Sequence, residues 1–197
     1  MNGFRMHNNS SMKIKSILKS GVLSLKTSQY AHCSERYPKN EISEANLTHH
    51  ISASFIESGY NLYAEFPISK GRLLDLVAFS DDHNEWIAIE AKRNLHSNQD
   101  KVLADFKRLE EISNDDWIEG AKVKKVILVM NRHPKLSTWW KTRGTSSLEG
   151  IQATEKESGF EQFSEIKRHL KESEYVDSFQ WYTQEKDWVY EVLYAIS

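Results

Sequence analysis

The spacing of apolar residues predicts a helix in the first clearly patterned part of the chain. Leu47, Ile51 and Phe55 recur every four residues, which places them on one face of a helix. Ser43 is a suitable N-cap, and Gly59 is a suitable first residue after the helix. We therefore expect a helix that begins near Ser43 and ends just before Gly59.

Three strand-like runs follow this helix, separated by short polar turns. They cover residues 61–67, 72–80 and 85–92. The turns between them are Ser69-Lys70-Gly71 and Asp81-Asp82-His83-Asn84. Because strands joined by such short turns pair in antiparallel order, the sequence predicts a three-strand antiparallel meander.

A second helix and a buried strand come next. In residues 96–112 the apolar residues Val102, Phe106 and Leu109 recur at helical intervals. Residues 124–131 are almost continuously apolar, as in a strand covered on both faces. Because a strand reached through a helix usually pairs in parallel, we expect this strand to lie parallel to a strand of the meander.

The last part of the chain has weaker patterns. Residues 155–171 are expected to be helical, and residues 178–182 and 188–195 to form two strands or a strand and a helix. Helices and strands thus alternate after the meander, which predicts an α/β fold with a layered core.

Charge divides the chain into two parts. Residues 1–40 contain seven basic residues and one acid, a formal charge of +6. Because the net charge of the whole chain is −2, residues 41–197 carry a formal charge of −8. Their Ser, Asn and Lys content and weak periodicity predict a flexible basic arm, or a short helix near residues 13–25. The expected organisation is this arm, 1–40, followed by one domain, 41–197. Such an arm either contacts phosphates or is a solvated tail.

Composition excludes several classes of protein. No apolar run approaches the ~20 residues of a membrane helix, so no membrane partner is expected. Lys13, Lys15 and Lys19 interrupt the best candidate for a signal sequence, residues 12–25, which makes a cytoplasmic location the expectation. The single cysteine, Cys33, excludes an internal disulfide and a cysteine-based zinc site.

Two acids and a lysine lie within the apolar strands of the meander. Asp75 is the acid of residues 72–80, whereas Glu90 and Lys92 share one face of the next strand. Buried carboxylates that lie side by side repel each other, so a cation is expected between Asp75 and Glu90. Oxygen ligands in this number suit Mg²⁺ or Mn²⁺, which would activate water beside Lys92 for phosphodiester hydrolysis. The alternative is a row of polar residues that faces solvent.

Asp75 in one strand of a hairpin and Glu90-Ala91-Lys92 in the next, with a helix before and after, resembles the PD-(D/E)XK nuclease superfamily. The resemblance covers roughly residues 44–109, and Leu74 stands where the family motif has proline. It implies a restriction-endonuclease-like α/β fold with a central mixed sheet flanked by helices. It also implies Asp75 and Glu90 as ligands of Mg²⁺ or Mn²⁺, Lys92 as the catalytic lysine and Glu44 as the acid of the first helix.

The activity implied by the resemblance is metal-dependent hydrolysis of DNA, by an enzyme that often works as a homodimer in this superfamily. The alternative is a protein of the same fold that binds nucleic acid or assembles with a partner without cutting. Glu41 and Glu57 compete with Glu44 for the role of helix acid, and Glu65 is either a further ligand or an exposed acid.

Several further residues are candidates for nucleic-acid contacts. The resemblance places residues 96–112 beside the site, so Gln99 would assist it and Lys101 and Arg108 would contact phosphates. The alternative for these residues is an ordinary charged helix face. Trp139-Trp140, which precede two basic residues, would either stack on bases or pack in the core.

Overall fold

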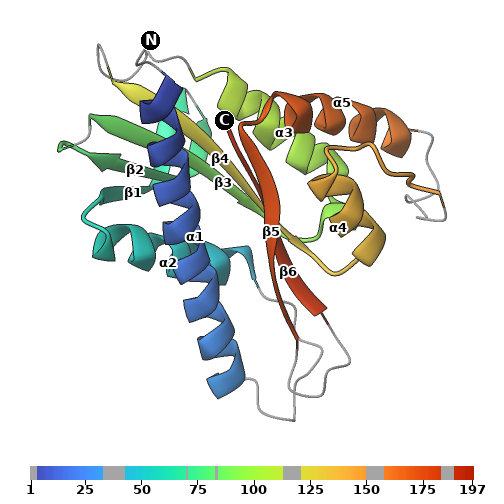
Figure 1. The fold of residues 1–197 in the computed structure, drawn as a ribbon, viewed down its shortest axis with the longest axis horizontal. Coiled ribbons are helices and arrows are strands. Elements are labelled where there is room, and N and C mark those ends of the chain that lie inside the picture. The colour runs from blue at the N-terminus through green and yellow to red at the C-terminus, as the bar shows by residue number, and fades with distance from the viewer. Residues whose placement is uncertain are drawn as a thin grey trace.

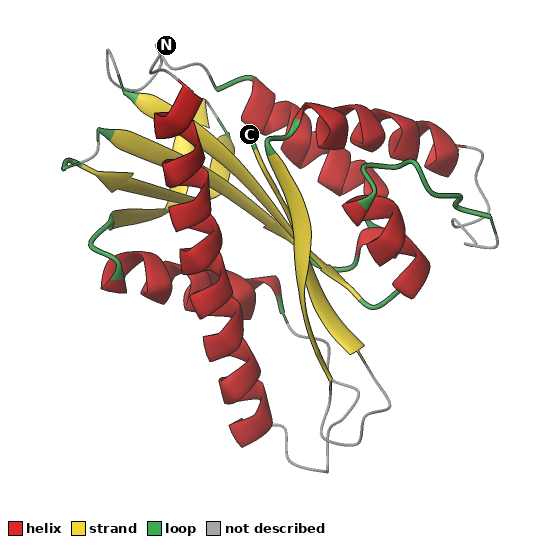
Figure 2. Ribbon diagram, viewed as in Figure 1, coloured by secondary structure: helices red, strands yellow, loops and turns green. Residues whose placement is uncertain are grey.

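The computed structural model describes residues 4–32, 43–69, 71–82, 84–112, 121–149, 158–182 and 189–197. Five helices and six strands are formed within these residues, with a short 3-10 turn at Leu95–Ser97 (Figure 2). The helices are α1 (Phe4–His32), α2 (Glu44–Glu57), α3 (Gln99–Glu110), α4 (Pro134–Lys141) and α5 (Ser158–Glu172). The strands are β1 (Asn61–Ser69), β2 (Arg72–Ser80), β3 (Glu85–Lys92), β4 (Lys122–Asn131), β5 (Tyr175–Tyr182) and β6 (Val189–Ile196).

The six strands form one mixed sheet in the order β1-β2-β3-β4-β6-β5. β1, β2 and β3 pair in antiparallel order, which confirms the predicted meander. β4 reaches the sheet through α3 and pairs in parallel with β3, as expected. β6 and β5 complete the sheet in antiparallel order, so the late segments are two strands.

Helices cover both faces of the sheet, which confirms an α/β fold with a mixed sheet flanked by helices. α1 and α2 pack on one face, and α3, α4 and α5 pack on the other (Figure 1). In β3 the two faces alternate: Ile87, Ile89 and Ala91 point towards α1 and α2, whereas Ala88 belongs to the core under α3. Among the described residues, none of the helices combines the length and apolar character needed to cross a membrane.

Helix α2 begins and ends as its sequence predicts. The Ser43 side chain accepts a hydrogen bond from the Asn46 amide at 3.1 Å, so Ser43 is the N-cap. Gly59 follows the helix with a φ of +84°, a left-handed conformation that glycine adopts without strain. Leu47, Ile51 and Phe55 are fully buried, so this face of α2 anchors the helix to the sheet.

The basic arm is where the structure differs most from expectation. Of the two alternatives for residues 1–40, a flexible arm or a short helix, the structure has a helix, and α1 is far longer than residues 13–25. Its packing explains why: Ile14, Leu18 and Val22 are almost completely buried in the core shared by α2 and the sheet. Residues 33–42, which include Cys33 and Glu41, lie outside the described residues.

Polar contacts also join α1 to the last part of the chain. The Ser11 hydroxyl donates to a Glu174 carboxylate oxygen at 2.7 Å, and Lys15 forms an ion pair with Asp177 at 3.3 Å. These contacts complement the apolar packing of α1, so the helix is an integral part of the same core.

Helix α4 is the element that the sequence did not predict. It carries Trp139 and Trp140, which are 2% and 0% exposed, and the Trp140 indole donates to the Tyr194 carbonyl at 3.1 Å. The prediction that these two residues stack on bases is therefore wrong, and the alternative, that they pack in the core, is confirmed.

Candidate functional site

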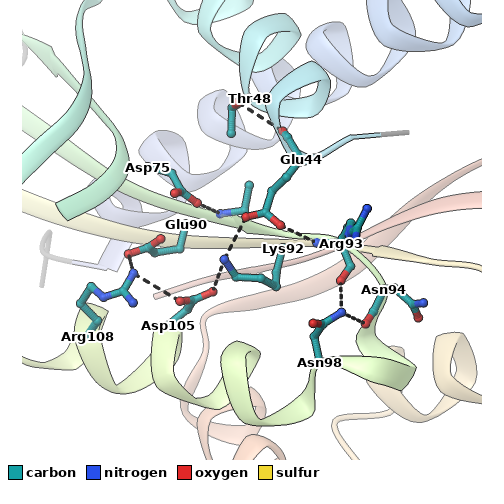
Figure 3. A network of polar contacts seen from close by, with 11 residues as sticks. Glu44, Thr48, Asp75, Glu90, Lys92, Arg93, Asn94, Asn98, Asp105 and Arg108 are labelled. Carbon is teal, nitrogen blue, oxygen red and sulfur yellow. Dashed lines mark hydrogen bonds and ion pairs between the residues drawn. The ribbon is translucent and has the colours of Figure 1, made fainter. Parts of the chain in front are cut away.

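The candidate site lies where β2 and β3 separate. The last residue pair of their ladder is Leu76 with Ile89. Beyond this pair, an Asp75 carboxylate oxygen accepts a hydrogen bond from the Ala91 amide at 2.8 Å (Figure 3). The side chain of Asp75 thus takes the place of a backbone acceptor, which fixes its carboxylate beside β3.

Glu90 and Lys92 point to the same side of β3, as their spacing predicts. Glu90 is 0% exposed, so these residues are not part of a solvent-facing polar row. One oxygen of Glu90 accepts a hydrogen bond from the Arg108 guanidinium, and the other, Oε2, has no hydrogen-bond partner among the described residues. A buried carboxylate oxygen without a partner is costly, and it is a suitable ligand for a cation.

Glu44 is the helix acid that reaches this site. Its position as the first residue of α2 places it at the end of β3, where Oε1 accepts a hydrogen bond from Lys92 Nζ at 2.9 Å. Its other oxygen accepts from the Arg93 amide at 3.2 Å (Figure 3). Glu57 lies at the opposite end of the same helix, about 20 Å away at 1.5 Å per residue. Glu65 is exposed on β1.

Asp105 is a member of the site that sequence reasoning missed. Its side chain on α3 is 2% exposed, and Oδ2 lies 3.4 Å from Lys92 Nζ. The signal was present in the sequence: Asp105 follows Val102 by three residues and precedes Leu109 by four, so it lies on the buried face of its helix. An acid on such a face needs a charged partner, and Asp105 has two, Lys92 and Arg108, the latter at 3.3 Å.

Burial and mutual repulsion raise the pKa values of two carboxyl groups in this site. Burial, reinforced by the charges of Asp75 and Asp105, raises the pKa of Glu90 to about 8, although Arg108 opposes the change. Burial likewise raises the pKa of Asp105 to about 6, against the opposing effect of Lys92 and Arg108. Such changes are expected where a buried site holds more negative charge than its own cations neutralise.

Lys92 is held between carboxylates and keeps its proton. Burial lowers the pKa of its ammonium group, but the hydrogen bond to Glu44 and the charges of Asp105, Glu44 and Asp75 raise the pKa above its ordinary value overall. The Nζ atom therefore acts as a hydrogen-bond donor at neutral pH.

The donor set fits a divalent cation such as Mg²⁺ or Mn²⁺. Four carboxylates surround two cationic side chains, and the site leaves the buried Oε2 atom of Glu90 without a hydrogen-bond partner in the described part of the chain. Mg²⁺ typically takes one or two protein carboxylates and completes its shell with water and phosphate oxygens. Asp75 and Glu90 can supply those two ligands.

A second acidic cluster does not need a metal. In the described ranges, Glu110, His169 and Glu172 place ligand atoms within 4.8 Å of one another. However, Arg168 forms ion pairs with Glu110 at 3.5 Å and with Glu172 at 3.3 Å, and His169 contacts Glu110 at 2.7 Å. These contacts balance the two acids, so we interpret the cluster as an ion-pair network on α3 and α5.

The residues predicted to contact nucleic acid lie in different environments. Gln99 is 4% exposed and donates to the carbonyl of His96, so its amide is engaged at the start of α3. Lys101 is exposed on the same helix. Arg108 faces Glu90 and Asp105 instead of solvent, so it belongs to the acidic site (Figure 3).

Comparison with protein-family models, with curated proteins and with solved structures gave no match to this chain.

Proposed function

We propose that this protein is a metal-dependent nuclease of restriction-endonuclease-like fold that hydrolyses phosphodiester bonds in DNA. One observation carries the proposal: β2, β3, α2 and α3 bring Asp75, Glu90, Glu44 and Asp105 together around Lys92. The composition of this site matches what hydrolysis of a phosphodiester needs, because carboxylates bind the metal and an ammonium group lies beside them.

Asp75 and Glu90 would hold the Mg²⁺ or Mn²⁺ ion. When bound, such an ion lowers the pKa of a water ligand and stabilises negative charge on the phosphoryl oxygens. Oε2 of Glu90 is available for this role without displacing Arg108, which binds the other oxygen. Asp75 is held in place by the Ala91 amide, so it is oriented before the ion arrives.

Lys92 orients the attacking water and stabilises charge on the phosphate. The ammonium group is fixed in position because it donates a hydrogen bond to Glu44 at 2.9 Å and forms an ion pair with Asp105 at 3.4 Å. Glu44 and Asp105 act through Lys92, so both are positioning residues. Because Glu44 also accepts from the Arg93 amide, it ties the end of β3 to α2.

The test is cleavage of supercoiled plasmid and of labelled single-stranded, duplex and branched oligonucleotides, in Mg²⁺, Mn²⁺ or EDTA. We expect cutting that requires the metal and is lost in Lys92→Ala and in Glu90→Ala. Lys107→Ala is the matched control, because it removes the same charge from a lysine that pairs with Glu165 on the surface. Metal-dependent cutting that survives in Glu90→Ala would show that the proposed site is not the active site.

A second candidate is a protein that binds nucleic acid without cutting it. The ion pairs of Glu90 with Arg108 and of Lys92 with Glu44 favour it, because they satisfy part of the charge of the site without a metal. Binding of the same oligonucleotides without cleavage in either metal would support this candidate over the nuclease.

A further inference from the structure

A pocket lies near the acidic site, at the end of the sheet where β3 and β4 end. This small pocket of about 30 Å³ is bordered by Arg93, Asn94, Arg132, Tyr190 and Glu191. Arg93 directly follows Lys92, the last residue of β3, and Arg132 follows the last residue of β4. These are the carboxyl ends of two neighbouring parallel strands, the position where open α/β sheets bind their ligands.

The side chain of Arg132 is positioned by an aromatic stack. Its guanidinium carbon lies 4.8 Å from the centre of the Tyr190 ring, and Nη2 donates to the Tyr190 hydroxyl at 3.4 Å. Tyr190 stacks on Trp181 at 5.6 Å and 17°, and the Trp181 indole donates to Gln29 of α1 at 3.0 Å. Both rings are buried, so they support the guanidinium and are not themselves a surface for stacking bases.

The acid in the wall of the pocket is already satisfied. Glu191 is 4% exposed, and one of its oxygens accepts from the Ser137 hydroxyl at 2.6 Å and from the Gln180 amide at 2.7 Å. Its other oxygen accepts from the Asn131 amide at 2.9 Å, and Lys141 lies 3.9 Å from the carboxylate. The carboxylate is thus engaged within the protein, and the two arginines that border the pocket, Arg93 and Arg132, are exposed.

The pocket is joined to the acidic site through the backbone. Arg93 and Lys92 have Cα atoms only about 3.8 Å apart, and successive residues of a strand point to opposite faces. Glu44 binds both the Lys92 ammonium and the Arg93 amide, so one side chain fixes the two residues relative to each other. A ligand that extends past the end of β3 would contact both sites.

We propose that Arg93 and Arg132 form an anion-binding subsite that holds a phosphate adjacent to the scissile one, on the same nucleic-acid strand. Guanidinium groups bind phosphate through paired, charge-assisted hydrogen bonds, and Arg132 is already oriented for this. The phosphate would set the position of the strand relative to Asp75 and Glu90. The inference rests on the proposed function in one respect, namely that the same strand reaches the acidic site.

The test is the salt dependence of oligonucleotide binding in EDTA, where no cleavage is expected. Fluorescence anisotropy gives the dissociation constant of a short labelled single strand over a range of NaCl concentrations, for wild type, Arg93→Gln, Arg132→Gln and the double variant. Because each neutralised phosphate of a single strand contributes ~0.7 to the slope of log K against log salt, the double variant should lose about that amount and not twice it. Its affinity should fall about tenfold at moderate salt, as for loss of a charge-assisted contact.

Arg168→Gln is the matched control, because it removes the same charge from α5, where Arg168 pairs with Glu110 and Glu172. An unchanged slope in this control and a reduced slope in the pocket variants support the subsite. Circular dichroism melts of all variants check that the Tyr190 and Trp181 stack has not unfolded. Equal slopes in wild type and the double variant, or no binding by the wild type, would overturn the proposal.

Inorganic phosphate and a mononucleotide are tested as competitors. If inorganic phosphate or the mononucleotide displaces the oligonucleotide with a dissociation constant in the micromolar range, the subsite binds a free phosphate and the assignment to a nucleic-acid strand is overturned. The cleavage assay reports on Lys92 and the binding assay on Arg93 and Arg132, so failure of the subsite and failure of the nuclease are distinguishable.

Discussion

Replacing Glu90 with glutamine should make the stability of the protein much less dependent on pH. The amide side chain of the Glu90→Gln variant still offers an oxygen to Arg108, so the hydrogen bond and the packing are retained. What the substitution removes is a buried group whose pKa is about 8 in the folded protein, against 4.5 for an ordinary glutamate.

The direction in which stability changes with pH follows from the proton that Glu90 binds. Because the folded state holds the Glu90 proton more tightly than the unfolded state, stability is highest below the unfolded pKa and falls as the pH rises through the folded value. Each pKa unit is worth about 1.36 kcal/mol, so the wild type should lose roughly 3 kcal/mol from this residue between about pH 5 and about pH 8. Glu90→Gln should not lose this amount.

Urea unfolding of both proteins across this pH range measures the difference. Glu172→Gln is the control, because it removes an exposed acid from α5 and should follow the wild type. Parallel loss of stability in wild type and Glu90→Gln would refute the argument that Glu90 is a buried acid with a raised pKa.

Urea unfolding also tests whether the acidic site binds a metal ion. At about pH 8, Mg²⁺ at ten times its dissociation constant should stabilise the wild type by about 1.4 kcal/mol, because it binds the folded state only. Glu90→Gln lacks a carboxylate ligand and should gain much less. An equal gain in both proteins would place the metal elsewhere.

Four further predictions concern two other residues of the acidic site and two residues of the core. Asp75→Ala should lose about 1–3 kcal/mol in urea unfolding, because the Ala91 amide loses its acceptor, whereas Asp75→Asn should retain stability and both should lose the gain from Mg²⁺. Asp105→Asn removes a carboxylate that holds Lys92 and should lower kcat about 10- to 100-fold at unchanged KM in the plasmid assay; an unchanged kcat would contradict its positioning role. Gly21→Ala should destabilise the protein despite a helix propensity gain of about 1 kcal/mol, because its Cβ would lie 3.0 Å from backbone atoms of α2; a higher melting temperature would contradict this. Trp140→Phe should cost roughly 1–3 kcal/mol in urea unfolding and leave the salt slope of oligonucleotide binding unchanged, since the indole is buried against β6.

The strands and the two central helices could be predicted from the sequence because their two faces differ chemically. In β3, Ile87 and Ile89 alternate with residues of the opposite face, and α2 has both a capping serine and a terminal glycine. Helix α4 could not be predicted in this way. It has only eight residues, which is about two turns, and Pro134 at its start resembles a loop signal as much as a first helical residue.

The length of helix α1 was underestimated because only its middle part has an apolar stripe. Ile14, Ile17, Leu18, Val22 and Leu25 lie at helical spacing, whereas the residues before and after them are mostly polar. The depth of its packing depends on Gly21, whose missing side chain permits close approach to Ile51, and this contact is tertiary. The local sequence pattern alone does not reveal this contact between Gly21 and Ile51.

The residues of the acidic site that lie on β2 and β3 could be predicted from the sequence. Asp75, Glu90 and Lys92 are fixed by the hairpin, and the structure also brings Glu44 to Lys92. Asp105 was missed because an acid on an amphipathic helix is usually exposed, and its burial depends on how α3 is rotated against β3. The pairing of Arg108 with Glu90 depends on the same rotation.

The contacts of α1 with Glu174 and with β5 have a consequence for synthesis on the ribosome. Ser11 and Glu174 are 163 residues apart in the chain, and Lys15 and Asp177 are 162 apart. At typical translation rates this separation corresponds to about 10 to 30 s. During that interval α1 has left the ribosome but β5 and β6 have not, so the part of its apolar stripe that these strands cover stays exposed until they emerge.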